Sequence, residues 1–218
     1  MIKKLLAIFM CGAMLSACTN TANTTSTKET PAPSPSQTTE AVEQTENSEL
    51  YADTIGFTIE LENGGIMKGE LYPNLAPITV ENFVDLCDDN FYDGLIFHRV
   101  IKGFMIQGGG YDKDMQPKET DSIKGEFDAN GVNNPLKHTK GVLSMARTQV
   151  PDSASSQFFI MHEDAPHLDG QYAAFGRVTE GFDIIDEIAT SETTIYQPYG
   201  MTDVPKEQIV IKTITIDD

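Results

Sequence analysis

Three segments of the sequence combine polar side chains with aromatic and thioether ones, and Arg99 lies in the first of them. An arginine stays protonated at any working pH and presents five N–H donors in a rigid fork. It is therefore a candidate donor to a lone pair in a reaction, although an arginine on a strand more often forms a surface ion pair. The segments are residues 97–109, residues 141–148 continued by 155–160, and residues 168–178.

Other kinds of catalytic site lack a complete motif here. The second histidine of His162-Glu163-…-His167 comes one residue too late for the zinc motif H-E-x-x-H, and Pro166 disfavours the helix that the motif needs. No G-x-S-x-G elbow of a serine hydrolase is present. The glycines at 108–110 precede Tyr-Asp-Lys rather than the Lys-Ser pair of a phosphate-binding loop.

The elements expected to carry the three segments are mostly short strands. Residues 56–62 alternate apolar and polar, Asn63-Gly64-Gly65 is a turn signal, and residues 66–72 read as the returning strand. Residues 194–206 are expected to be a long surface connection, with recognition of a partner as the alternative. Further short strands are predicted at 95–101, 104–107, 142–146, 157–161, 172–178 and 208–216.

Two helices complete the pattern. Pro77 suits the first turn of one, whose apolar stripe is Val80, Phe83, Val84 and Cys87. The other covers residues 181–189. Many short strands with two helices predict a closed β-barrel or a β-sandwich, and periodicity alone does not choose between them.

Together the three segments closely resemble the cyclophilin family of peptidyl-prolyl cis/trans isomerases, in its bacterial branch with Ala-Arg-Thr at 146–148. The resemblance extends over roughly residues 56–216. It implies a mainly β fold, a closed antiparallel eight-stranded barrel with two capping helices. It also implies a monomer that acts on proline-containing segments of unfolded or folding proteins.

Rotation about an X-Pro bond breaks no covalent bond, so it requires no nucleophile, metal or cofactor. The barrier, about 18–20 kcal/mol, comes from amide resonance, and both isomers are populated. When the bond is twisted, the proline nitrogen becomes amine-like and accepts a hydrogen bond. A donor aimed at that nitrogen and an apolar slot for the ring would serve, and about 1.4 kcal/mol of selective stabilisation gives tenfold in rate.

The resemblance assigns roles to named positions. Arg99, Phe104 and Gln107 match catalytic positions of the family. Because successive residues of a strand point to opposite faces, one of Phe158 and Phe159 can fill the core while the other lines the site. The positions that match substrate-binding residues are His98, Met105, Ala146, Arg147, Gln157, Phe159, His167, Leu168 and Tyr172.

Two departures from the family pattern stand out. Members that bind cyclosporin tightly carry Trp where His167 stands, and this chain has no Trp. Since histidine offers less area and lacks the indole donor, we expect weak cyclosporin binding with activity retained. The stretch from Met145 to Gln157 is one residue longer than in the animal members, which leaves the path of that loop open.

The N-terminus resembles a bacterial lipoprotein signal. Lys3 and Lys4 precede an apolar run at 5–15, which is too short to span a bilayer. The run ends in Leu15-Ser16-Ala17-Cys18, so we expect residues 1–17 to be a signal peptide and Cys18 to carry the lipid anchor. An ordinary secretory signal with a chance cysteine is the alternative.

Residues 18–50 are expected to be the lipidated cysteine and a disordered linker, followed by the isomerase domain at 51–218. The stretch 19–50 holds nine Thr, three Pro and five Glu against one Lys, and such a composition buries too little apolar surface to fold. These features predict an extracytoplasmic protein, lipid-anchored to the bacterial cell membrane. Cys87, in the apolar stripe of a predicted helix, is expected in the core.

The net charge of −18 argues against nucleic acid as a partner, because nucleic-acid binders present a basic face. It also argues against electrostatic adhesion to anionic lipid, which leaves the lipid anchor as the expected contact with the membrane. The alternative to an isomerase is a non-catalytic module, or holdase chaperone, that grips proline-containing segments without turnover. The presence of Arg99 disfavours this alternative.

Overall fold

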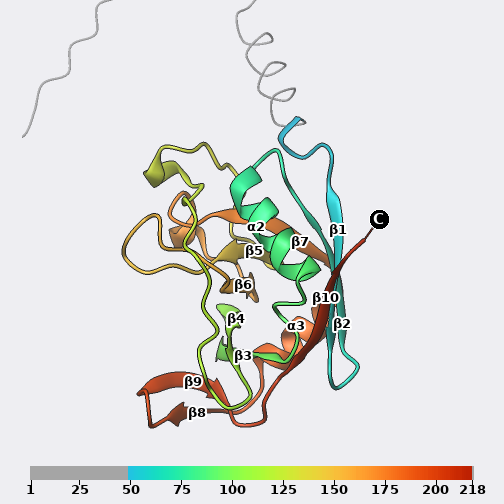
Figure 1. Ribbon diagram of the computed structural model, residues 1–218, viewed down its shortest axis with the longest axis vertical. Coiled ribbons are helices and arrows are strands. Elements are labelled where there is room, and N and C mark those ends of the chain that lie inside the picture. Colours follow the sequence, from blue (N-terminus) through green and yellow to red (C-terminus); the bar gives the residue numbers. More distant parts are fainter. Residues whose placement is uncertain (1–48, 218) are drawn as a thin grey trace, which may run out of the picture.

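The computed structural model describes residues 49–217, which form a nearly closed eight-stranded antiparallel barrel with two helices (Figure 1). The strands lie in the order β10-β1-β2-β7-β5-β6-β4-β3. Their bounds are β1 Ile55–Leu61, β2 Ile66–Leu71, β3 Leu95–Ile101, β4 Met105–Asp112, β5 Val142–Met145, β6 Phe158–Met161, β7 Ala174–Glu180 and β10 Ile211–Ile216.

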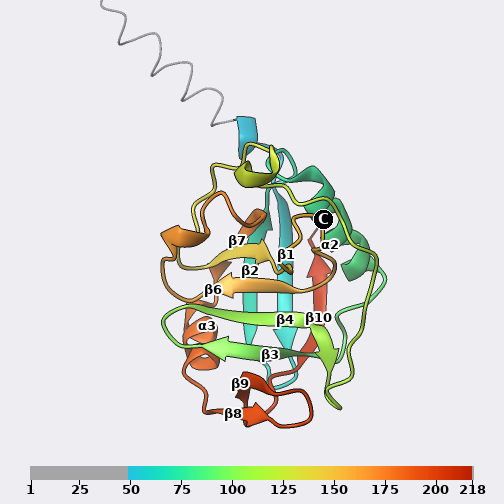
Figure 2. The same ribbon diagram turned by 90° about the vertical axis from the view of Figure 1, so that its left-hand side faces the viewer.

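The two edge strands, β3 and β10, meet through backbone hydrogen bonds. Gly94 N–H donates to Ile211 O at 2.9 Å and Phe97 N–H donates to Ile209 O at 2.9 Å. Figure 2 shows β3, β4 and β6 crossing in front of β1, β2 and β10. The fold is therefore a barrel and not a sandwich, as the resemblance to cyclophilins implied and as periodicity alone could not decide.

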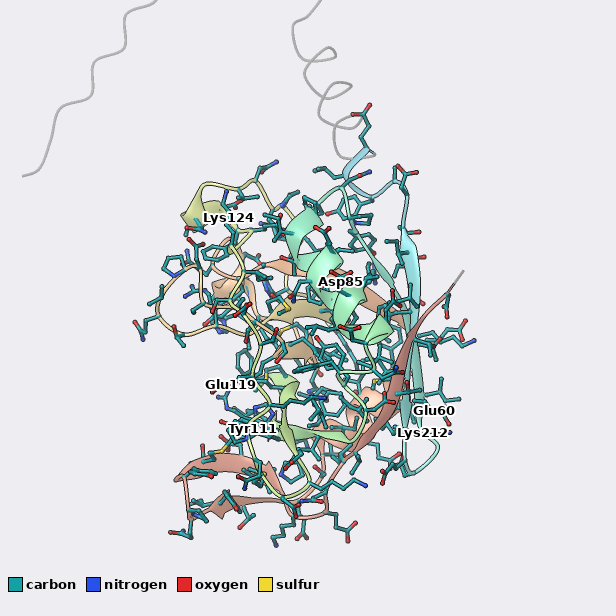
Figure 3. The ribbon with its side chains drawn as sticks, viewed as in Figure 1. Glu60, Asp85, Tyr111, Glu119, Lys124 and Lys212 are labelled. Atoms are coloured by element: carbon teal, nitrogen blue, oxygen red, sulfur yellow. The ribbon has the colours of Figure 1, made fainter. Side chains whose placement is uncertain are left out.

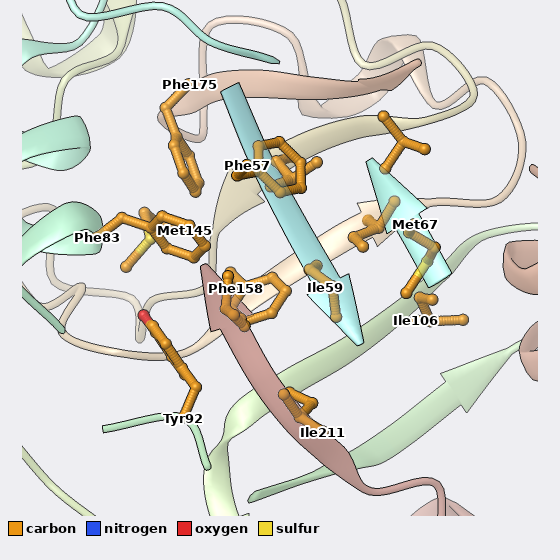
Figure 4. Packing of buried hydrophobic residues seen from close by; sticks show 14 of the residues in the cluster. Phe57, Ile59, Met67, Phe83, Tyr92, Ile106, Met145, Phe158, Phe175 and Ile211 are labelled. Carbon is orange, nitrogen blue, oxygen red and sulfur yellow. The ribbon is translucent and has the colours of Figure 1, made fainter. Parts of the chain in front are cut away.

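Alternation along the strands fills the barrel with apolar side chains. Phe57 and Ile59 of β1 point inward, and the ring of Phe83 packs edge-on against Phe158 with centroids 5.5 Å apart (Figure 4). Outside the barrel, Lys212 of β10 reaches Glu60 of β1 at 2.6 Å (Figure 3). Strand pairing thus separates an apolar interior from a charged exterior.

The helix α2 (Pro77–Asp88) begins with proline in its first turn, as expected, and buries Val80, Phe83 and Cys87. Burial raises the pKa of the Cys87 thiol, which fits its role as a core residue. The residue before the helix is Ala76, which offers no capping side chain. The buried carboxylate of Glu126 takes that role, accepting hydrogen bonds from Ile78 N–H, Thr79 N–H and the Thr79 hydroxyl at 3.1, 2.8 and 2.7 Å.

The second helix, α3 (Phe182–Ala189), follows β7 and buries Ile185, Ile188 and Ala189. Figure 2 shows α2 and α3 on opposite sides of the barrel. Two short 3-10 turns, Asp128–Asn130 and Pro166–Leu168, lie in the loops.

The structure differs from the sequence expectation in two places. Residues 194–206 are not a plain connection, because they contribute to a hairpin of β8 (Thr193–Tyr196) and β9 (Met201–Pro205). The hairpin packs beside β3 through an apolar cluster that includes Ile96, Met115, Val204 and Val210. The two strands are short and do not alternate apolar with polar residues, so the pattern did not predict them; the turn between them includes Gly200, at φ 63°.

Strand β4 also runs beyond residue 107, through the three glycines at 108–110. Glycine normally weakens a strand, so the pattern predicted an earlier end. Here a Cβ at Gly110 would lie 2.5 Å from the side chain of Gln157, so close packing accounts for the glycine.

The predicted signal peptide, Cys18 and nearly all of the predicted linker lie outside the described residues. Within residues 49–217, no helix is long and apolar enough to cross a membrane. In the same range no three His, Cys, Asp or Glu side chains are grouped to hold a metal ion.

Candidate active site

Nine of the residues singled out in the sequence surround one cavity of about 250 Å³ on the outer face of the barrel. They come from β3, β4 and β6, from the turn between β3 and β4, and from the loops that follow β5 and β6. The lining residues are Arg99, Phe104, Met105, Gln107, Ala146, Arg147, Phe159, Leu168 and Tyr172.

Strand register aligns the polar side of this cavity. Arg99 of β3 pairs with Gln107 of β4, which pairs with Phe159 of β6. The Arg99 guanidinium donates to Gln107 Oε1 at 3.3 Å, and Gln107 Nε2 donates to Gln157 Oε1 at 3.0 Å. These two hydrogen bonds hold the guanidinium at the edge of the cavity with N–H donors to spare.

The remaining walls are apolar. Met105, Phe159 and Leu168 are buried, and the rings of Phe159 and Tyr172 meet edge to face with centroids 5.8 Å apart. Phe158 points into the barrel core while Phe159 belongs to the cluster behind the cavity, so the predicted split between the two faces is confirmed. The cavity thus offers a small apolar slot with a fixed cation at its edge.

Three expected residues lie outside this cavity. Gln157 lines an adjoining cavity of about 380 Å³, which shares Gln107, Ala146 and Arg147 with the first. The ring of His167 stacks on Phe104, with centroids 5.8 Å apart, so it stands beside the slot and not in it.

His98 is buried, with its ring 4.7 Å from that of Tyr111, a residue that lines the adjoining cavity. Burial lowers the pKa of His98 to about 4, so its imidazole is neutral at neutral pH. The His98 side chain is therefore not exposed in the cavity, and its match to a substrate-binding position stays a prediction.

Arg147 turns its side chain away from the Arg99 side of the cavity. Its guanidinium lies over the rings of Phe127 and Tyr172, at 4.8 and 4.6 Å, and donates to the carbonyl oxygen of Gln171. The contact fixes Tyr172 by a cation–π interaction. The Arg147 side chain is thereby occupied by contacts within the protein.

The family model "Cyclophilin type peptidyl-prolyl cis-trans isomerase/CLD" matches residues 56–216. The chain belongs to this family. The matched range is the one over which the sequence motifs resemble cyclophilins. It covers the barrel from Gly56 onward and all the residues around the cavity.

Characterised relatives agree with this cyclophilin assignment. The chain is 42% identical over 168 residues to peptidyl-prolyl cis-trans isomerase B of Escherichia coli K12, covering 72% of this chain and 96% of that protein. It is 46% identical over 161 residues to a peptidyl-prolyl cis-trans isomerase of Acinetobacter baylyi, covering 71% and 81%. The chain is therefore a cyclophilin-type isomerase.

Solved cyclophilin structures share the fold. A cyclophilin type isomerase of Cryptosporidium parvum matches with a TM-score of 0.62 at 29% identity, over 76% of this chain and 98% of that one. A second structure of that protein, determined in the presence of the dipeptide Ala-Pro, matches with a TM-score of 0.61 at 29% identity, over 75% and 99%.

The structure also reveals polar residues that sequence reasoning passed over in this cyclophilin. His138, Ser144 and Asp169 form a hydrogen-bonded series directly behind Phe159. Ser144 and Asp169 lie inside the quoted motifs, and a buried polar residue within an apolar strand is a signal that could have identified Ser144. His138 precedes the motif, and no local pattern marks it.

Proposed function

We propose that this isomerase acts on X-Pro bonds of extracytoplasmic client proteins, with Arg99 as the donor to the proline nitrogen and the 250 Å³ cavity as the proline pocket. One observation supports the proposal above the others. A guanidinium fixed by Gln107 stands at the edge of a slot walled by Phe104, Met105 and Phe159.

Arg99 would act on the twisted state of the bond and not on either planar isomer. In the planar amide the nitrogen lone pair is delocalised, whereas in the twisted state it is free to accept a hydrogen bond. A donor that bonds only this state lowers the barrier without tightening ground-state binding. Because the guanidinium is held by Gln107, little reorganisation is needed when the lone pair develops.

The apolar walls would hold the proline ring still while the preceding residue rotates. A pyrrolidine ring fits an aromatic and thioether lining, and its burial excludes water from the nitrogen. The main chain at 146–147 would pair with the extended peptide beside the ring. Ala146 N–H already donates to Gln157 O at 2.9 Å, so we expect the Ala146 carbonyl to make that contact.

Replacement of Arg99 tests the proposal. We expect Arg99→Ala to lower kcat/KM in a protease-coupled prolyl-peptide assay by about 100-fold, the usual effect of losing one transition-state donor. Arg177 on β7 is a matched control, because it is an exposed strand arginine away from the cavity. Arg177→Ala should leave kcat/KM within about twofold of wild type.

The same assay separates the isomerase from a holdase that binds proline segments without turnover. Equal peptide binding by wild type and Arg99→Ala, with no turnover in either, would favour the holdase. An active wild type and an Arg99→Ala variant of equal kcat/KM would instead remove Arg99 from the catalytic role.

We also propose that the reaction takes place outside the cell membrane. A lipid on Cys18 and the linker at 19–50 would hold the barrel outside the bacterial membrane, where client segments emerge unfolded. Labelling cells with palmitate tests this, with Cys18→Ala as the control. Label on both proteins, or on neither, would contradict the anchor.

A further inference from the structure

Ser144, His138 and Asp169 lie in hydrogen-bonding series behind the proline pocket. The imidazole Nε2 of His138 is 3.0 Å from Ser144 Oγ, and its Nδ1 is 3.2 Å from Asp169 Oδ1. These are the residue types of a hydrolytic triad, but the side chains of Ser144 and His138 are fully buried. A buried hydroxyl cannot reach a substrate, so the series serves something other than nucleophilic attack.

The hydrogen bonds select one tautomer of His138. Burial alone would raise the pKa of Asp169, but hydrogen bonds from the His138 backbone and ring, with the Lys137 charge, lower it below its usual value. The carboxylate is therefore ionised and only accepts, so Nδ1 must carry the proton. Nε2 is then left to accept the hydrogen bond of the Ser144 hydroxyl.

The ring of His138 supports two walls of the pocket. It stacks on Phe159 with an interplanar angle of 20° and centroids 6.1 Å apart. It meets Tyr172 edge-on at 6.5 Å. Phe159 and Tyr172 both line the cavity, so a tilt of the His138 ring would shift both.

The backbone of His138 holds a third wall. Its carbonyl oxygen accepts from Ala165 N–H at 2.8 Å, and its N–H donates to Asp169 Oδ1 at 2.8 Å. These bonds bracket the short turn at Pro166–Leu168, which carries Leu168 into the cavity. His138 therefore contacts Phe159 of β6 through its ring and holds the turn that carries Leu168 through its backbone.

We propose that His138, oriented by Asp169 and Ser144, is the positioning residue that sets the shape of the proline pocket. The inference rests on the proposed role of the cavity. It assigns no proton transfer to the three residues and makes none of them a catalytic residue. We therefore expect the affinity of the pocket for the proline ring to depend on a neutral His138 imidazole with its proton on Nδ1.

Steady-state kinetics on the full chain tests the proposal. His138→Asn keeps a donor toward Asp169 but removes the ring, and we expect KM to rise about tenfold while kcat stays within about threefold, because Arg99 and Gln107 are untouched. Asp169→Ala should raise KM in the same way. Asp169→Asn keeps an acceptor oxygen for His138 and should restore most of the wild-type KM.

A matched control separates positioning from general loss of stability. Ile59→Val on β1 removes a methyl group from the barrel core, far from the cavity lining, and should lower Tm with KM unchanged. An unchanged KM in both His138→Asn and Asp169→Ala would overturn the proposal. Should His138→Asn fail to fold, the Asp169→Ala and Asp169→Asn pair decides.

Nitrogen NMR on the ¹⁵N-histidine-labelled wild type gives an independent readout. We expect a protonated Nδ1 and an unprotonated Nε2 for His138 at neutral pH, and the other tautomer or an imidazolium would overturn the assignment. A wild type without turnover would mean that the proposed function is wrong. Arg99-dependent turnover with KM insensitive to His138 and Asp169 would remove only this inference.

Discussion

Phe158 and Phe159 are neighbours on one short strand, β6, but they belong to two different apolar clusters. Phe158 is fully buried inside the barrel, beside Phe83 and Tyr92 (Figure 4). Phe97 also packs against it. Phe159 lies outside the barrel and lines an open cavity. The same residue type therefore stabilises the fold at one position and serves a site at the next.

The two clusters differ in what surrounds their rings. Around Phe158 the neighbours are nearly all hydrocarbon, so its position is determined by close packing. Behind Phe159 lies the polar series of His138, Ser144 and Asp169, whose hydrogen bonds have fixed directions. Close packing on every side holds the ring of Phe158 in place. The ring of Phe159 borders the cavity on one side, and the hydrogen-bonded series behind it supports it on the other.

Truncating each phenylalanine should separate the two roles. Phe158→Ala leaves a cavity in the closed core and should lower the free energy of unfolding by about 3–5 kcal/mol. Phe159→Ala opens into space that solvent reaches, so its stability loss should be smaller. Its kcat/KM should fall about tenfold or more, because a wall of the proline pocket is lost.

Urea unfolding and the prolyl-peptide assay, applied to both variants, check this. Phe158→Ala should retain near-normal kcat/KM per folded molecule in the absence of denaturant. Equal stability losses together with equal activity losses would show that the two clusters act as one.

The alternation that separates the two clusters is a local property, which is why the sequence predicted it. The strand β1, the proline at the start of α2 and the two faces of β6 all depend on residues close together in the chain. The capping of α2 by Glu126 joins positions 47 residues apart, and the Asp169–His138 bond joins positions 31 apart. No spacing within one element carries such information.

Periodicity could not predict closure of the barrel for the same reason, since closure depends on hydrogen bonds between the segments near Phe97 and Ile209. The resemblance to cyclophilins did predict it. Most of the site could be predicted because its residues fall in long ordered motifs. The burial of His98 could not be predicted, because a motif records which residue stands at a position and not how deeply it is buried.

Strand β3 shows the same contrast between neighbouring residues, here Phe97 and His98. Phe97 lies inside the barrel, and His98, one residue later, is buried on the outer face beside Tyr111. Burial lowers the pKa of His98 from 6.5 to about 4 in the folded protein. The unfolded chain binds the proton more readily, so stability is full above about pH 6.5 and falls as the pH drops toward about 4.

The loss from this one group should be about 2 kcal/mol at about pH 5 relative to neutral pH. Comparing urea unfolding of wild type and His98→Gln at the two pH values isolates it, since other groups titrate in both proteins. The wild type should lose about 2 kcal/mol more than the variant. An equal loss in both would mean that His98 is protonated freely in the folded state.

The smallest expected effect is a change in cyclosporin affinity on substitution of His167, an exposed residue that stacks on Phe104 beside the cavity. A tryptophan there would add apolar area and an indole N–H beside the slot. At about 25 cal/mol per Å², roughly 50 Å² of added contact is worth about 1.3 kcal/mol, or about tenfold in affinity. We therefore expect wild type to bind cyclosporin weakly and His167→Trp to bind it about tenfold more tightly.

Inhibition of the coupled assay by cyclosporin measures both proteins, and their uninhibited kcat/KM should agree within about threefold because His167 lies outside the cavity lining. A nanomolar inhibition constant for wild type would contradict the expectation. The substitution also tests the boundary of the pocket. If His167→Trp changed peptide KM as strongly as cyclosporin affinity, His167 would belong to the walls that His138 positions and not to a separate outer edge.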